Sequence, residues 1–267
     1  MRTIAFIFEY DGTAFAGWQL QVEQRTVHLE IRRVLETVLR QPGVVVHCSG
    51  RTDAGVHALY QVAHIETESA LDLEKLRGSL QAMLPRDIAV LAVSDMPAGF
   101  HARRSAEKKT YLYRILNRRP RTALDDMRVW HVVPRLDVAA MQTASLALLG
   151  KQDFASFEGH LSQAKHTVRT ILDVQWNAAG DELHLRVTGD GFLKHMVRNI
   201  AGTLVEIGLG KRAPAGMRSI IDARDRTQAG RTAPPQGLYL ERVVYPEPFE
   251  SALRAGLRFR DEPPIDR

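Results

Sequence analysis

Cysteine is almost absent from the 267-residue sequence: Cys48 is the only one, so a framework of internal disulfides is excluded. Cys48 lies among valines and is expected to be a small core residue in a reducing compartment. No uninterrupted apolar run approaches the roughly 18 residues that cross a bilayer. The first residues also lack the small-residue cleavage site of a signal peptide. These absences predict a cytoplasmic protein with no membrane contact.

Several common catalytic motifs are incomplete. His64-Ile65-Glu66 matches the start of a zinc deaminase signature, but the cysteine pair which that chemistry requires is missing. Gly208-Leu209-Gly210-Lys211 lacks the remaining residues of a dinucleotide fingerprint or a P-loop and is typical of a helix end. The ten histidines show no ligand-like spacing. We therefore expect no metal.

Positive charge is present and unevenly distributed. The net charge is +5, and 45% of the residues are hydrophobic, which is enough for a buried core. Between His101 and Arg121, eight Lys or Arg residues accompany a single acid, Glu107. Tyr111 and Tyr113 lie inside this stretch. Clustered cations attract phosphates, and interleaved aromatic rings can stack on unpaired bases, so the pattern favours nucleic-acid binding over an ordinary solvated loop.

Hydrophobic periodicity indicates two similar successions of elements. In the first, strands are expected at 3–10 (buried on one face), 44–48, 59–65 and 88–93, with helices from Val27, capped by Thr26, and over 73–84. In the second, strands are expected at 109–115, 167–177 and 183–189, with helices from Asp137 to Gly150 and over 192–207. This order predicts an α+β protein with two halves, 1–107 and 108–267. The segment after Pro246 is expected to be a surface extension.

The segment Gly50-Arg51-Thr52-Asp53-Ala54-Gly55 is the densest candidate for chemistry. Two glycines bracket a compact triplet after a strand, and glycine lets a backbone approach a ligand closely. Arg51 would keep the carboxylate of Asp53 ionised and could also hold a phosphate. The alternative, which local chemistry alone favours, is an ordinary turn with a surface contact between these two side chains.

A second candidate is a polar stripe on the helix expected at 192–207. Its members recur at helical spacing and share one face: His195, Arg198, Asn199 and Gly202. A different stripe is expected to face the core: Phe192, Met196, Ile200 and Leu204. The polar stripe can line a cleft, or it can be simply the solvated face of an amphipathic helix.

The stretch from Gly50 to Ala58 resembles the signature of the TruA-type tRNA pseudouridine synthases. The similarity extends along most of the chain. Further matching segments follow in the family's order and spacing: 9–12, 17–19, 100–103, 109–113, 192 with 195–200, 232–234 and 237–240. Each segment alone is modest, whereas their combination is highly specific.

The resemblance implies roles for individual residues. Asp53 matches the family's catalytic aspartate, and Tyr111 matches a tyrosine that stacks on the target base. Arg198 looks like the arginine that pairs with the aspartate, Arg51 like a residue that holds RNA and helps to flip the nucleotide, and Leu240 like an apolar residue beneath the base. Contacts with the RNA backbone are expected from Arg103, Lys108, Lys109, Lys194 and His195.

The implied fold is a pseudouridine synthase fold, with two ferredoxin-like halves forming a mixed, mostly antiparallel sheet, helices on one side and an RNA-binding cleft on the other. The implied reaction converts uridines on the 3′ side of the tRNA anticodon loop and stem to pseudouridine, in a homodimer. The bond from N1 of uracil to ribose breaks and the base rejoins through C5. Because nothing is oxidised and no group is transferred, no cofactor is expected. The aspartate can attack C6 or C1′, or act as a base at the sugar.

Two other classes of function stay open on the sequence. The charge of 101–121 is compatible with a non-catalytic tRNA-binding protein or RNA chaperone. An RNA enzyme of another chemistry, such as a nuclease, is less well supported because paired carboxylates for metal ions are missing.

Overall fold

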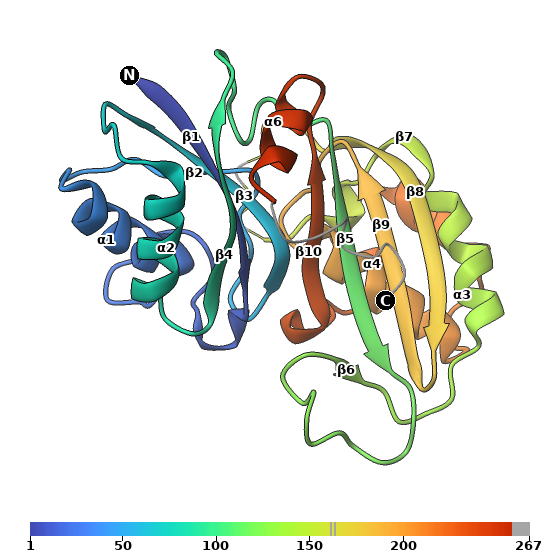
Figure 1. The fold of residues 1–267 in the computed structure, drawn as a ribbon. Helices are drawn as coiled ribbons and strands as arrows, with labels where there is room; N and C mark the ends of the chain where they lie inside the picture. Colours follow the sequence, from blue (N-terminus) through green and yellow to red (C-terminus); the bar gives the residue numbers. More distant parts are fainter. Residues whose placement is uncertain (161, 163, 258–267) are drawn as a thin grey trace. The chain divides into compact units, whose positions relative to one another are not determined.

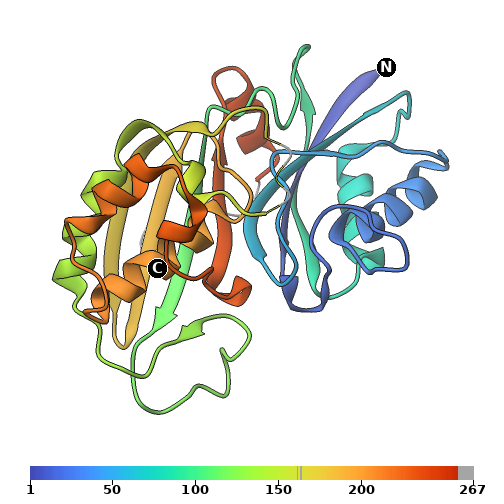
Figure 2. The same cartoon turned by 180° about the vertical axis from the view of Figure 1, so that it is seen from behind.

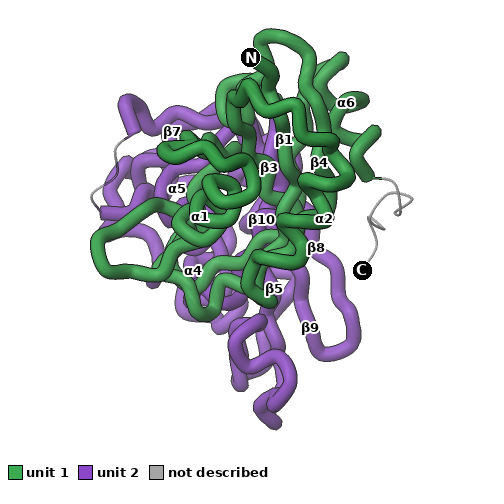
Figure 3. Tube along the Cα trace, turned by 60° about the vertical axis from the view of Figure 1, so that its left-hand side comes forward, with its two compact units in different colours: residues 1–107, 242–267 green, residues 108–241 purple. Residues whose placement is uncertain are grey.

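The computed structural model describes residues 1–160, 162 and 164–257, which fall into two compact units (Figure 3). Unit 1 contains Met1–Glu107 and the segment that begins at Arg242, and unit 2 contains Lys108–Glu241. The sequence-based division placed everything after residue 107 in one half. The structure instead returns the chain to unit 1 after Glu241. In the part of the chain described, no helix is long and apolar enough to cross a membrane.

Unit 1 is built around β1 (Arg2–Tyr10), which lies between β3 (His57–Thr67) and β4 (Ile88–Met96) and pairs with both in antiparallel fashion (Figure 1). The short β2 (His47–Cys48) pairs with β3. Five successive residues of β1, Ile4 to Phe8, are completely buried. The predicted single buried face of this strand is therefore wrong: helices or strands cover it on both faces.

Three helices and one short turn complete unit 1. They are η1 (Gly12–Ala14), α1 (Val27–Leu39), α2 (Leu73–Met83) and α6 (Phe249–Ala255). The predicted cap of α1 is confirmed, since the Thr26 side chain accepts a hydrogen bond from the backbone N–H of Leu29. The segment after Pro246 is not a surface extension as far as Leu257, because α6 packs on β4 and buries Leu253.

Unit 2 has a sheet in the order β5-β9-β8-β7, with antiparallel pairing throughout, and β6 pairs with β5 in parallel. The strands are β5 (Lys108–Leu116), β6 (Trp130–His131), β7 (Gly150–Asp153), β8 (Val168–Ala179) and β9 (Glu182–Gly189). β10 (Leu238–Val244) passes from unit 2 into unit 1. The α+β prediction with mostly antiparallel strands is confirmed.

The helices of unit 2 gather on one face of its sheet (Figures 1 and 2). They are α3 (Val138–Ser145), α4 (Met196–Gly208) and α5 (Gly216–Ala223), with the 3-10 turns η2 (Leu146–Leu148), η3 (Ala155–Phe157), η4 (Arg226–Gln228) and η5 (Pro235–Gly237). Buried Met196, Ile200 and Leu204 belong to the core, as predicted, whereas Phe192 lies before the helix and is half-buried.

Several predicted boundaries are wrong. The strand expected at 44–48 is reduced to His47–Cys48, and Cys48 is half-buried instead of lying in the core. The helix expected to reach Gly150 ends at Ser145 and continues only as η2. The helix expected from residue 192 begins at Met196, because His195 has a left-handed backbone conformation (φ 60°) that an α-helix cannot contain.

Candidate functional site

Asp53 lies in the loop of unit 1 that joins β2 to β3. Its carbonyl oxygen accepts a hydrogen bond from the N–H of Val56 at 3.2 Å, which closes a tight turn over Asp53–Val56. The third residue of this turn, Gly55, has a φ of 75°, a conformation that glycine adopts without strain. Asp53 is half-buried and Arg51 is exposed. The expected Asx-type turn would be closed by the Asp53 side chain, whereas the turn seen here is closed by backbone groups, and it presents Asp53 at the surface of a well-anchored backbone.

A buried hydrogen-bond network without formal charge supports this loop. The hydroxyls of Tyr10 and Thr52 are 2.8 Å apart. Gln61 donates from Nε2 to the carbonyl of Gly50 at 2.7 Å and accepts from the hydroxyl of Ser49 at 2.7 Å. All four side chains are buried. Burial raises the pKa of the Tyr10 hydroxyl well above its usual range, so Tyr10 stays neutral.

Two glycines let the segment after β1 press directly on the loop. A Cβ atom at Gly12 would lie 2.0 Å from the carbonyl oxygen of Val56, and one at Gly17 would lie 2.7 Å from that of Thr52. The N–H of Trp18 donates to the same Thr52 carbonyl at 3.0 Å. The backbone on both sides of Asp53 is thus fixed from a segment about forty residues earlier, which explains why 9–12 and 17–19 accompany the signature.

Tyr111 lies in unit 2, on β5 opposite Val187. Its ring packs edge-on against Phe192, with the centroids 4.9 Å apart, and its exposed fraction is 8%. Tyr113 differs, although it lies only two residues further along the same strand. It is fully buried, and its hydroxyl donates to the carbonyl of Pro234 at 2.7 Å. The prediction that both tyrosines offer stacking surfaces is therefore wrong for Tyr113.

Arg198 lies in the first turns of α4. Its Nε donates to the carbonyl of Ala233 at 2.8 Å, and the N–H of Ala233 donates back to the carbonyl of Arg198 at 3.1 Å. The predicted polar stripe around it is not solvated. Asn199 is fully buried, and a Cβ atom at Gly202 would lie 1.8 Å from the carbonyl oxygen of Arg231. These two residues hold the backbone against α4 instead of lining a cleft.

Lys194 and His195 form the turn before α4. The Lys194 ammonium donates to the carbonyl of His160 at 3.0 Å. The His195 ring lies against Gly159, where a Cβ atom would be 2.7 Å from Nδ1. Both residues therefore anchor the 159–160 segment. Lys194 is exposed and His195 half-buried. Leu240, from the same unit, lies on β10 and is completely buried.

The basic stretch 101–121 is not one continuous surface. Arg114 makes a two-pronged ion pair with Glu182 at 2.9 Å, and Arg118 pairs with Asp181 at 3.3 Å. Both guanidinium groups therefore form ion pairs with acids of unit 2. Lys108 and Lys109 are half-buried at the start of β5, whereas Arg103 of unit 1 is exposed. Arg103 is thus the most accessible of these expected RNA-backbone contacts.

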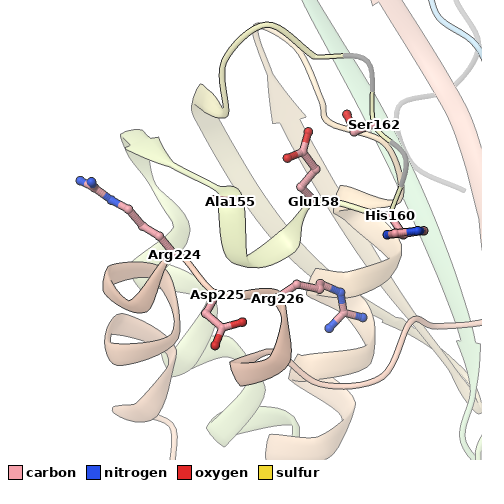
Figure 4. A pocket seen from close by; sticks show the side chains of 8 residues that line it. Ala155, Glu158, His160, Ser162, Arg224, Asp225 and Arg226 are labelled. Carbon is pink, nitrogen blue, oxygen red and sulfur yellow. The ribbon is translucent and has the colours of Figure 1, made fainter.

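An open cavity of about 560 Å³ lies elsewhere in unit 2 (Figure 4). Its lining consists of Ala155, Glu158, Gly159, His160, Ser162, Arg224, Asp225 and Arg226. None of these residues was a sequence candidate. Among the residues that the structure describes, no group of three or more His, Cys, Asp or Glu side chains is arranged to hold a metal ion.

Comparisons with known proteins identify close relatives. The profile of the tRNA pseudouridine synthase family matches residues 6–103 and 144–246. A tRNA pseudouridine synthase A from Methylobacterium nodulans is 43% identical over 253 residues, which cover 94% of this chain and 99% of the relative. Proteins of the same name from Citrifermentans bemidjiense and Lysinibacillus sphaericus are 44% and 43% identical, over 92% of this chain and 99% and 100% of theirs.

Proposed function

The chain belongs to the tRNA pseudouridine synthase family, and from that premise we propose that it isomerises uridines on the 3′ side of the tRNA anticodon loop and stem, with Asp53 as the essential carboxylate. The enzyme class is that of an isomerase acting on tRNA. The observation that carries the choice of Asp53 is the anchoring of its loop. Buried hydrogen bonds and two glycines fix the backbone around one half-buried acid.

In the proposed reaction the target nucleotide leaves its stack and is bound by residues that the family resemblance assigns: Asp53 and Arg51, which belong to unit 1, and Tyr111, Arg198 and Leu240, which belong to unit 2. Extrusion costs a few kcal/mol, which stacking on an aromatic ring and phosphate contacts offset. Tyr111 is suited to stacking because its ring is held edge-on by Phe192. Leu240 is proposed, from the resemblance, as the apolar residue beneath the base, and it is completely buried on β10.

The resemblance implies that Arg198 is the partner of the aspartate, and a guanidinium group has the charge and planar shape suited to a carboxylate. Within unit 2, the Ala233 carbonyl fixes the Nε of Arg198. Whether the carboxylate attacks C6, attacks C1′ or removes a sugar proton, it acts in the ionised form. The bond from N1 of uracil to the ribose breaks, the base rejoins the ribose through C5, and C5 loses a proton while N1 gains one, so the isomerisation balances without a cofactor.

The decisive experiment incubates purified protein with tRNA and maps pseudouridine along the anticodon stem-loop. Asp53→Asn is expected to abolish formation of pseudouridine while tRNA binding persists, because the amide keeps the shape of the side chain but loses its charge. Glu66→Gln, a charge-neutralising change at an exposed position of β3, is the matched control and is expected to remain active. Full turnover by Asp53→Asn would refute the proposal.

The same assay separates the alternatives. A tRNA-binding protein without catalytic activity would bind tRNA in a salt-sensitive way and leave it unmodified, and Asp53→Asn would be silent. A metal-dependent nuclease would cleave the tRNA and lose activity on addition of a chelator, to which the isomerase is indifferent.

We further propose that the enzyme acts as a homodimer in the cytoplasm, where its tRNA substrate is found. The dimer rests on the family resemblance and is supported by exposed leucines near the edge of unit 2. Leu149, directly before β7, is 41% exposed, and Leu172 on β8 is 52% exposed; the residues next to them, Gly150 and Ile171, are paired. Light scattering of the purified protein tests the proposal, since a mass near one 29.9 kDa chain would contradict it.

A further inference from the structure

Arg226, which is half-buried, lies at the centre of a hydrogen-bond network in unit 2 that no sequence motif indicated. From Nη2 it donates to Oδ1 of Asn199 and to the hydroxyl of Thr232, both at 3.0 Å. From Nη1 it donates to the carbonyl of Gly230 at 3.0 Å. The Thr232 hydroxyl donates in turn to Oδ1 of Asn199 at 2.6 Å. One guanidinium group thus joins α4 to the segment 229–233.

The same segment is held against α4 at further points. The N–H of Gly230 donates to the hydroxyl of Thr203 at 2.9 Å, and the N–H of Arg231 donates to Glu206 at 2.9 Å. At Gly202 the backbones approach so closely that no side chain fits between them. Ala233 directly follows Thr232, and its carbonyl accepts a hydrogen bond from Nε of Arg198 at 2.8 Å. Any shift of the segment therefore displaces the acceptor that orients Arg198.

We propose that Arg226 is a positioning residue for the isomerisation: it fixes the 229–233 segment on α4 and thereby sets the orientation of Arg198 through the carbonyl of Ala233. This inference rests on the proposed function of Arg198. Arg226 is not a catalytic residue, because its hydrogen-bonding groups are directed to Asn199, Thr232 and Gly230. Arg226 acts on Arg198 through one contact, the hydrogen bond from Arg198 to the carbonyl of Ala233. The effects of substituting Arg226 and Arg198 on the reaction rate are therefore expected to be coupled.

The geometry requires arginine at this position. A planar guanidinium group reaches several acceptors in fixed directions from three nitrogens, whereas a lysine ammonium carries all its donors on one nitrogen. Burial lowers the pKa of Arg226, so the cation is partly desolvated, and its acceptors are oxygens of carbonyl, amide and hydroxyl groups. Arg226→Lys therefore keeps the charge but cannot join Asn199, Thr232 and Gly230 at once.

The test is a double-mutant cycle between Arg226→Lys and Arg198→Ala, measured as the single-turnover rate of pseudouridine formation and as the Kd for tRNA. Arg226→Lys is expected to lower the rate by about 10- to 100-fold, since small displacements of active groups have effects of this order. The Kd is expected to change by less than about threefold, because phosphate contacts dominate affinity. In the Arg198→Ala background, Arg226→Lys is expected to cause no further loss of rate.

Thr232→Val provides a milder variant that keeps the shape of the side chain and removes the hydroxyl that links Arg226 to Asn199. It is expected to lower the rate in the same direction, and Thr232→Ser is expected to restore it. Arg218→Lys, at an exposed arginine of α5 paired with Asp222, is the matched control and is expected to leave the rate unchanged.

Equal losses from Arg226→Lys in the wild-type and Arg198→Ala backgrounds would show a general structural role and overturn the inference. A wild-type rate in both Arg226→Lys and Thr232→Val would overturn it as well. Failure of the proposed function gives a different result, because the unmodified protein would then form no pseudouridine at all.

Discussion

The two units anchor their candidate residues in different ways. In unit 1, the loop of Asp53 rests on neutral side chains and on two glycines that bring one backbone directly against another. In unit 2, the segment that orients Arg198 is held by the long, charged side chain of Arg226. A backbone contact tolerates no added atom, whereas a side-chain bridge fails when its hydrogen bonds are removed. Unit 2 also has such a backbone contact at Gly202, so both units are expected to be sensitive to added atoms, and unit 2 also to the loss of a side-chain bridge.

The largest effect is expected from Gly12→Ala in unit 1. The new Cβ would lie 2.0 Å from the carbonyl oxygen of Val56, and a backbone carbonyl cannot move aside as a flexible side chain does. The loop of Asp53 must shift, and we expect a loss of about 100-fold or more in single-turnover rate. Gly78→Ala, in α2 with open space around it, is the control and is expected to stabilise the protein by up to about 1 kcal/mol. An active Gly12→Ala would show that the contact is not essential.

Acid is expected to weaken unit 1 next, through His64. The ring is buried beside His47, His101 and Arg104, and its Nδ1 accepts from the N–H of Ala102 at 3.2 Å. Burial, followed by electrostatic repulsion from His101, His47 and Arg104, lowers the pKa of His64 to about 4. As the pH falls, the His64 ring therefore binds a proton in the unfolded state before it does so in the folded state. The contribution of neutral His64 to stability is present above the pKa of the unfolded state and is lost as the pH falls towards the pKa of the folded state.

The unfolding free energy is accordingly expected to fall by about 2 kcal/mol between pH 7 and pH 5 on account of this group. Urea denaturation at several pH values measures the change. His64→Asn, whose side-chain oxygen can still accept from Ala102, is expected to flatten this dependence. An unchanged pH dependence in His64→Asn would assign the effect to other groups.

A smaller effect is expected from Gln61→Leu. The change removes the donor to the Gly50 carbonyl and the acceptor of the Ser49 hydroxyl, both in a buried site. Buried groups left without partners cost about 1–2 kcal/mol each, and we expect a loss of this order in the unfolding free energy. Tyr10→Phe, which removes one hydroxyl from the same network, is expected to cost less. Equal stability of Gln61→Leu and wild type would show that water replaces the amide.

The smallest effects are expected in the basic stretch. Arg103→Gln is expected to weaken tRNA binding by a few-fold and to reduce its salt dependence by about one charge, since Arg103 is exposed. Arg114→Gln should leave the salt dependence unchanged, because Arg114 is already paired with Glu182. Filter binding over a range of salt concentrations compares the two. A larger salt effect for Arg114→Gln would reverse this ranking.

Local patterns predicted the elements whose determinants lie within a few residues. The start of α1 was predicted because Thr26 caps it directly, and α2 ends within one residue of its expected position. The start of α4 was not, because the left-handed turn at His195 depends on Gly159, which is distant in sequence. Hydrophobic periodicity depends only on the order of residues along the chain, so it cannot indicate a contact between two distant segments.

The candidate site shows the same division. The resemblance identified Asp53, Tyr111 and Arg198, and the prediction that these residues act together stays a prediction. Gln61 and Arg226 were missed, since the role of such a polar residue is recognised only from the groups that surround it. Tyr111 and Tyr113 lie two residues apart on one strand, and the complete burial of Tyr113 and its bond to the carbonyl of Pro234 show that Tyr113 belongs to the core.

The return of the chain to unit 1 at Arg242 has a consequence for synthesis on the ribosome. Phe100 packs against Tyr245 and Phe249, and the Tyr245 hydroxyl donates to the carbonyl of Ala102, so the last segment closes the unit that is translated first. A nascent chain cannot finish the unit that carries Asp53 until all of unit 2 has been made. A chain that ends before Arg242 would leave β4 and Phe100 uncovered. Such a product is expected to expose apolar surface and to be recognised by chaperones and proteases as unfolded.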